Sequence, residues 1–203
     1  MRSGSTRDRI LDAAARVMLE QGVAGATTKQ IARAAGVAEG TLYIHFKDKS
    51  ELYMAVLHER SPGFIPMLAA LSEQVGEGTV EERLTGALLK ALPFYRATIP
   101  MSASYLYDPE LLARHREFLR ERGAGPRRGN ELLARYLRAE QALGRVRPDA
   151  DLDAIVDLLL GACLMHVLWE LVSDDQPAPP QEDARYIARI VGSVMPLLAP
   201  DGD

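Results

Sequence analysis

The residues from Gly36 to Lys49, GVAEGTLYIHFKDK, gather hydrogen-bonding and basic side chains within the length of one short helix and its flanks. Hydroxyl, imidazole and ammonium groups bind phosphate oxygens and the edges of bases, so the segment is suited to a polyanionic partner. Glu39 is the exception, because a carboxylate in this segment would be repelled by such a partner. The whole chain also carries a formal net charge of −4.

This negative charge is spread unevenly along the chain. Residues 1–50 hold eight Lys and Arg against five Asp and Glu, a balance of +3, which leaves −7 for the rest. Such asymmetry indicates nucleic-acid contact by the positive part. The length of 203 residues and the content of 47% hydrophobic and 26% charged residues are typical of one large or two small globular domains.

Helical signals follow one another through the first sixty residues. Thr27 and Gln30 match a capping box, Asp48 is a further N-cap, and Gly22 and Gly36 are typical helix ends. The helices expected here cover 7–21, 28–35, 38–46 and 49–59.

Longer periodic segments follow residue 63, and the sequence has no alternating strand pattern of useful length. The predicted class is therefore all-α. The further helices expected cover 64–75, 80–92, 94–106, 109–122, 127–142, 152–172 and 182–198, with Gly or Pro residues between them.

Ala32, Gly36 and Leu42 have the spacing of a helix-turn-helix motif. The alanine lets two helices cross closely, the glycine permits the positive φ of a tight turn, and the leucine packs the second helix on the first. The first turns of the helix expected over 38–46 are then free to enter a major groove.

Residues 7–58 resemble the DNA-binding domain of the tetracycline-repressor (TetR) family of bacterial transcriptional regulators. The resemblance rests on TTKQIARAAGVAEGTLYIHFKDKSEL, with its joint motif of T-x-x-x-I-A, A-G-V, G-T-L-Y-x-H-F and K-x-K-x-x-L. It implies a three-helix DNA-binding domain over residues 1–50 and a larger helical ligand-binding and dimerisation domain over 51–203. It further implies a regulator that binds a near-palindromic operator as a dimer and is released by a small molecule. Repression is the more common sense in the family, and activation stays an alternative.

Carried over position by position, the resemblance assigns DNA contacts. Thr28 and the free N–H groups at its helix start would hold a phosphate, and Lys49 matches a phosphate clamp. Thr41 and Tyr43 would meet thymine methyl groups or phosphate oxygens, and His45 a phosphate. The predicted DNA-binding residues are Thr28, Lys29, Glu39, Gly40, Thr41, Tyr43, His45 and Lys49.

Each of these residues also has a simpler interpretation. Tyr43 could be a core aromatic, although Leu42 and Phe46 already supply the inward pair. His45 could pack or cap, and the two lysines could be solvated charges. Glu39 could stabilise its helix through the macrodipole, or it could accept a hydrogen bond from cytosine N4.

Two apolar stripes near the C-terminus predict a homodimer. The last two helices of TetR-family proteins usually pair with their copies as a four-helix bundle, and these helices are apolar over wider arcs than one partner would cover. A single-chain core is the alternative. The residues predicted at the dimer interface are Ile155, Leu159, Cys163, Val167, Ile187, Ile190, Val191, Val194 and Leu198.

A small apolar or aromatic effector is the second expected partner, because bulky side chains with a few polar groups gather on the middle helices. Most such residues in proteins are simply core residues, which is the alternative. The predicted ligand-contacting residues are Met101, Tyr105, Tyr107, His115, Phe118, His166 and Trp169.

An enzyme, a metal site and a cofactor are not predicted. Cys163 has no basic partner near it in sequence, the four histidines lack metal-ligand spacing, and no Gly-rich phosphate loop occurs. The lone cysteine and the absence of a signal-peptide layout predict a cytoplasmic protein. The apolar run over 158–169 is shorter than the roughly 20 residues of a membrane span. A helical scaffold that no longer binds DNA is the remaining rival.

Overall fold

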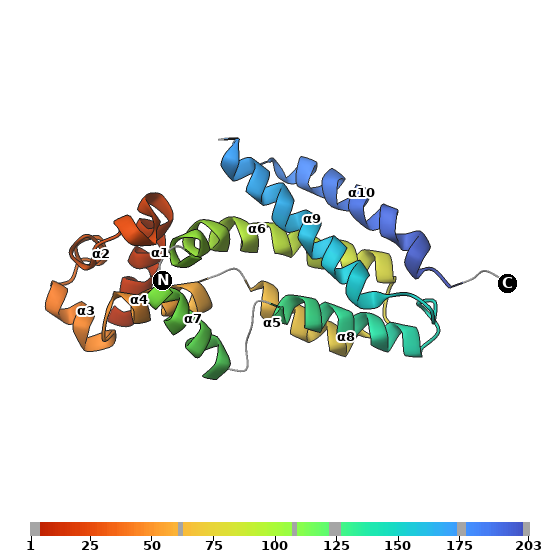
Figure 1. Cartoon of the computed structure of the whole chain (residues 1–203), viewed down its shortest axis with the longest axis horizontal. Helices are drawn as coiled ribbons and strands as arrows, with labels where there is room; N and C mark the ends of the chain where they lie inside the picture. The colour runs from red at the N-terminus through yellow and green to blue at the C-terminus, as the bar shows by residue number, and fades with distance from the viewer. Residues whose placement is uncertain (1–4, 61–62, 107–108, 122–126, 174–177, 201–203) are drawn as a thin grey trace. The chain divides into compact units, whose positions relative to one another are not determined.

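The computed structural model describes residues 5–60, 63–106, 109–121, 127–173 and 178–200, and every regular element in these ranges is a helix (Figure 1). The all-α prediction is therefore confirmed. The chain forms two compact units, one of residues 1–61 with 97–125 and the other of residues 62–96 with 126–203. The predicted domain boundary at residue 50 stays a prediction.

The first unit contains α1 (Thr6–Gly25), α2 (Thr28–Ala35), α3 (Glu39–His45), α4 (Lys49–Glu59) and α7 (Pro109–Glu121). The local stop and start signals explain most of these bounds. Thr27 and Gln30 form the predicted capping box, Asp48 caps α4, and Gly36 ends α2 with φ of 67°. Gly22 has φ of 70° and interrupts α1, which then resumes for one short turn.

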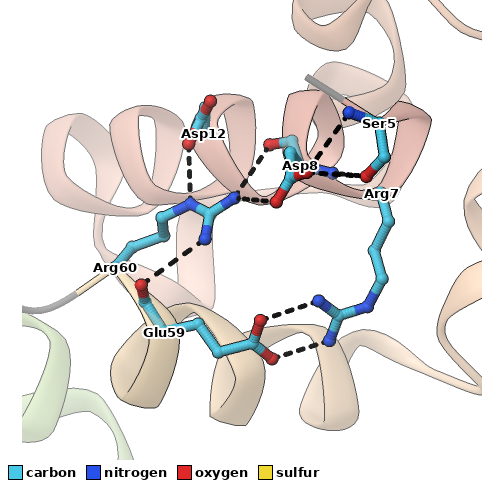
Figure 2. Close-up of polar contacts among 6 residues, drawn as sticks. All are labelled: Ser5, Arg7, Asp8, Asp12, Glu59 and Arg60. Carbon is cyan, nitrogen blue, oxygen red and sulfur yellow. Dashed lines mark hydrogen bonds and ion pairs between the residues drawn. The ribbon is translucent and has the colours of Figure 1, made fainter. Parts of the chain in front are cut away.

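Ion pairs join the beginning of α1 to the end of α4 (Figure 2). The Arg7 guanidinium donates to both Glu59 oxygens, at 2.6 and 2.7 Å. Arg60 donates to Asp8 and to Asp12, each at 2.7 Å. All of these partners lie 48 or 52 residues apart, so helical spacing alone did not predict them.

The second unit contains α5 (Phe64–Ala70), the 3₁₀ helix η1 (Leu71–Gln74), the first part of α6 (Val80–Leu106), α8 (Arg128–Ala142), α9 (Leu152–Val172) and α10 (Pro180–Leu198). Helix α5 lies beside α8, and α9 lies beside both α8 and α10 (Figure 1). The bounds of α9 are those predicted from the sequence.

The predicted break at Pro93 is wrong, because α6 runs through it as one helix. A proline lacks one N–H, so it removes only one hydrogen bond of the helix directly. Buried apolar residues precede it, including Leu88 and Leu92. The Phe94 ring follows it and packs 5.2 Å from the Phe64 ring, centroid to centroid. Packing on both sides of the proline therefore keeps the helix continuous.

Helix α9 is long and apolar enough to cross a membrane by length and composition. Core helices of globular proteins pass the same test. One stripe of α9, which includes Ile155, Leu159, Cys163 and Val167, is buried inside the second unit. The stripe therefore packs against the rest of the chain, although 33% of the apolar window of α9 is buried in all.

Candidate nucleic-acid interface

The turn between α2 and α3 is held by a side chain from α1. Ala32 and Leu42 are buried where the two helices pack, as the motif predicts. The Arg9 guanidinium donates to the carbonyl oxygens of Ala35 and Gly36, at 2.7 and 3.1 Å. These bonds satisfy carbonyl groups that a helix end leaves without partners. Arg9 has no signal of this role in the sequence, because its partners lie 26 and 27 residues away.

Three of the predicted DNA-binding residues are joined by hydrogen bonds. The Thr28 hydroxyl donates to Oε1 of Glu39 at 2.7 Å, and the Tyr43 hydroxyl donates to Thr28 Oγ1 at 3.3 Å. The bonds connect the first residue of α2 to the first residue of α3 and to a residue one turn further along it. The Glu39 carboxylate therefore organises this surface, a role that sequence reasoning did not identify.

The outer face of α3 is exposed. Leu42 is fully buried, whereas the exposed fractions of Tyr43 and Ile44 are 50% and 80%. A half-exposed ring is not a core aromatic, so that interpretation of Tyr43 is wrong. Gly40 is also exposed, and a Cβ atom added to it would meet nothing within 4 Å. Ile44 was not predicted, although its place opposite Leu42 on the helix could have indicated it.

Basic groups flank this face. Lys29 and Arg33 of α2 are exposed, as is Lys47 just after α3. Lys49 is half-buried in the first turn of α4, where burial lowers its pKa from the usual value. Thr41 and His45 are also half-buried. The eight predicted DNA-binding residues thus all belong to α2, α3 or the start of α4 within one compact unit.

Helix α7 packs on α4 in the same unit. The Arg114 guanidinium donates to Oδ2 of Asp48 at 2.6 Å, and that carboxylate also caps α4. The side chain of His115 is buried with Nδ1 3.4 Å from the Met54 sulfur. Burial lowers the pKa of His115, which favours the neutral imidazole.

The predicted ligand residues are only partly described. Tyr107 and the side chains of Met101, Tyr105 and Phe118 lie outside the described residues. His115 belongs to the first unit, whereas His166 and Trp169 belong to the second. Trp169 is 60% exposed, and the His166 ring stacks on Tyr186 with centroids 4.0 Å apart. His166 borders an open hollow of about 380 Å³ on α9 and α10.

His166, Glu170 and Asp183 offer ligand atoms within 4.8 Å of one another. Sequence spacing did not predict this cluster, because Asp183 comes from a different helix. Arg96 supplies a positive charge to the two carboxylates of this cluster. Its guanidinium donates four hydrogen bonds of 2.7 to 2.8 Å to them. The hydrogen bond from Arg96 also lowers the pKa of Glu170. A guanidinium thus neutralises the acids.

The residues predicted at a dimer interface pack within their own chain instead. Eight of the nine are buried inside the second unit, and Ile190 is half-buried. A side chain already covered by its own chain offers no area to a second copy. The large apolar side chains that α9 and α10 leave exposed are Leu158, Leu164, Met165, Leu168, Trp169, Leu171, Val172 and Leu197.

Comparison with known proteins adds a family likeness. Residues 10–56 match the family model "Bacterial regulatory proteins, tetR family". A segment of 55 residues is 54% identical to the HTH-type transcriptional regulator SrpR of Pseudomonas putida. This match covers 27% of this chain and 26% of SrpR, so it spans about a quarter of each protein. Over 199 residues the chain is 27% identical to the HTH-type transcriptional repressor KstR2 of Mycolicibacterium smegmatis, covering 94% of this chain and 91% of KstR2.

The fold of the whole chain also has counterparts among solved structures. One is the Bacillus subtilis transcriptional regulator FadR in complex with stearoyl-CoA, with 19% identity and a TM-score of 0.66. That match covers 91% of this chain and 96% of FadR. At this identity the likeness is one of fold.

Proposed function

Since this chain belongs to the tetR family of bacterial regulatory proteins through its N-terminal domain, we propose that it is a ligand-responsive transcriptional regulator that binds operator DNA. The relatives carry the names of regulators, and the enzyme alternative is set aside on that ground. The observation that carries the proposal is the exposed face of α2 and α3, where the hydrogen bonds among Thr28, Glu39 and Tyr43 fix the side chains before any DNA arrives. Preorganised groups bind with a smaller entropic cost.

A salt titration tests whether this face binds DNA. The affinity of the full chain for labelled genomic duplexes is measured as the salt concentration rises. Lysines and arginines that neutralise phosphates release counterions, so a steep linear fall of log affinity against log salt is expected. Lys29→Ala should make that slope shallower. A chain that retains no duplex even at low salt is better described as a helical scaffold.

A second copy of the chain is the partner that we assign to the exposed apolar face of α9 and α10. Trp169 and Val172 are 60% and 77% exposed there. Large exposed apolar surfaces usually mark an interaction site. A two-fold axis would then present two α3 helices to successive major grooves, about 34–36 Å apart on a near-palindromic site.

A small apolar or aromatic effector is proposed to oppose DNA binding. FadR, which shares the fold, was solved with stearoyl-CoA, and KstR2 is named a repressor. The FadR complex supports ligand binding, and the name of KstR2 supports repression. If DNA and effector favour different states of the protein, each weakens the binding of the other by the same factor.

Helix α7 provides a physical route for this opposition within the first unit. Arg114 of α7 holds the N-cap residue of α4, and α4 in turn packs on α1. A displacement of α7 would thereby pull on the first turn of α4, which carries Lys49.

We also propose a cytoplasmic location, because that is where the operator DNA of a bacterium lies.

A further inference from the structure

Gly40 and Ile44 are exposed on the side of α3 that lies opposite its buried Leu42. A helix turns about 100° per residue, so these two positions lie roughly 160° and 200° from Leu42. Leu42 is fully buried, and Ile44 is 80% exposed. A Cβ atom added to Gly40 would have no neighbour within 4 Å. The exposed side of α3 opposite Leu42 thus carries a bare backbone and an aliphatic side chain.

The free protein gives no structural reason for an isoleucine at this place. With four fifths of its surface exposed, Ile44 gains little from burial. A β-branched residue is also a poor choice for an exposed helix position. Its nearest outward neighbours in sequence, Tyr43 and Lys47, instead carry hydrogen-bonding groups suited to a polar partner.

We propose that Ile44 selects thymine in the operator by packing on its C5-methyl group. The inference rests on the proposed DNA binding and deepens it. Isoleucine has no donor or acceptor, and the thymine methyl is the distinctive apolar group that base pairs present in the major groove. Gly40 lies one turn before Ile44, and its missing side chain lets the backbone of α3 come close to the bases.

Replacing thymine by deoxyuridine tests this contact, because deoxyuridine lacks only the methyl group. An operator is first selected from genomic fragments, and each thymine of one half-site is then replaced singly. For the full chain we expect a loss of about 4-fold at one thymine position, the value of one buried methyl group. Ile44→Ala should lose about this factor in each half-site of the thymine operator, because both subunits carry the substitution. Its affinity should then fall no further when deoxyuridine is placed at that position.

Such a double-mutant cycle isolates the contact between the side chain and the methyl group. Leu19→Ala is the matched control, because Leu19 is also an exposed leucine-sized side chain of the same unit, 53% exposed on α1. It should leave the loss at deoxyuridine unchanged. With Ile44→Val, deoxyuridine should still cause most of the affinity loss that it causes for the wild type. Thermal melting verifies that each variant folds.

Two results would overturn the inference in distinguishable ways. If wild-type protein and Ile44→Ala lose equal factors at every deoxyuridine, the operator is bound but Ile44 does not select thymine. If no duplex is bound under any condition, the proposed function fails and the thymine contact with it.

Discussion

The Thr28 hydroxyl donates a 2.7 Å hydrogen bond to the Glu39 carboxylate and so fastens the start of α2 to the start of α3. Tyr43 extends the connection by donating to Thr28. An acidic residue on a DNA-binding surface would ordinarily be unfavourable. Here one of its oxygens accepts the bond from Thr28, a residue that we predict to contact DNA, so it is engaged within the protein.

Substitutions of Glu39 separate its charge from its hydrogen bond. Glu39→Gln keeps an oxygen that Thr28 can reach but removes a negative charge, so affinity should rise about 3-fold on all sequences, or about 0.7 kcal/mol. Glu39→Ala also releases the Thr28 hydroxyl, to which Tyr43 donates, and the ratio of operator to random-sequence affinity should fall. Binding titrations on operator variants check both. A loss confined to variants at one cytosine position would instead favour base readout by Glu39.

Gly40→Ala should stabilise the protein and weaken DNA binding at the same time. The new methyl group meets nothing in the free protein, and alanine is better than glycine in an exposed helix by about 0.5–1 kcal/mol. Against a groove, the same methyl group would keep the backbone of α3 away from the bases.

Gly86→Ala in α6 is the control for this substitution, since a Cβ atom there also meets nothing within 4 Å. It should raise thermal stability similarly and leave operator affinity alone. Equal affinities for Gly40→Ala and wild type would argue against close approach at Gly40.

Short-range signals explain which parts of this site were predictable. The capping box of Thr27 and Gln30 spans three residues, and Gly36 marks the end of α2 by itself. Both could therefore be found by spacing alone. The contact from Arg9 to the carbonyl oxygen of Gly36 depends on how α1 crosses α2, which local periodicity does not determine.

The dimer prediction shows the same limit on a larger scale. Periodicity correctly indicated that α9 is apolar on more than one side. It did not indicate which side meets the rest of the chain. Val167 is fully buried, whereas Trp169, two residues later, is 60% exposed. The choice between the two faces depends on the packing of α8 and α10 against α9.

Trp169→Glu should convert a dimer to a monomer, because a charged group at a buried apolar interface lacks a partner and costs several kcal/mol. Sedimentation velocity at micromolar concentration measures the change. Leu143→Glu is the control: Leu143 is 58% exposed at the end of α8, outside the proposed surface. The interface is placed wrongly if Trp169→Glu sediments as the wild type does.

Acid should loosen the connection between α1 and α4. The hydrogen bond from Arg7 lowers the pKa of Glu59 below its usual 4.5. The pair therefore contributes stability above that pH, and the contribution is lost as the pH falls through the lower folded-state value. Since both side chains are 40% exposed, solvent screening limits the contribution of this ion pair to stability to about 1 kcal/mol.

Chemical unfolding of Glu59→Gln and wild type between pH 7 and pH 3 measures this contribution. The difference between their free energies of unfolding should be present at neutral pH and vanish in acid. Glu20→Gln serves as the control, because Glu20 is exposed on α1 and has no partner in the described part of the chain. A difference that stays constant with pH would show that the Glu59 carboxylate is not the group involved.

The identity of the DNA that the full chain retains tests the central claim most directly. Purified protein is mixed with sheared genomic DNA at low salt, and the bound fragments are sequenced. We expect enrichment of a near-palindromic site, and Tyr43→Ala should diminish that enrichment because it removes a side chain from the exposed face of α3. Fragments without a shared sequence, recovered equally by wild type and Tyr43→Ala, would contradict operator recognition by α2 and α3.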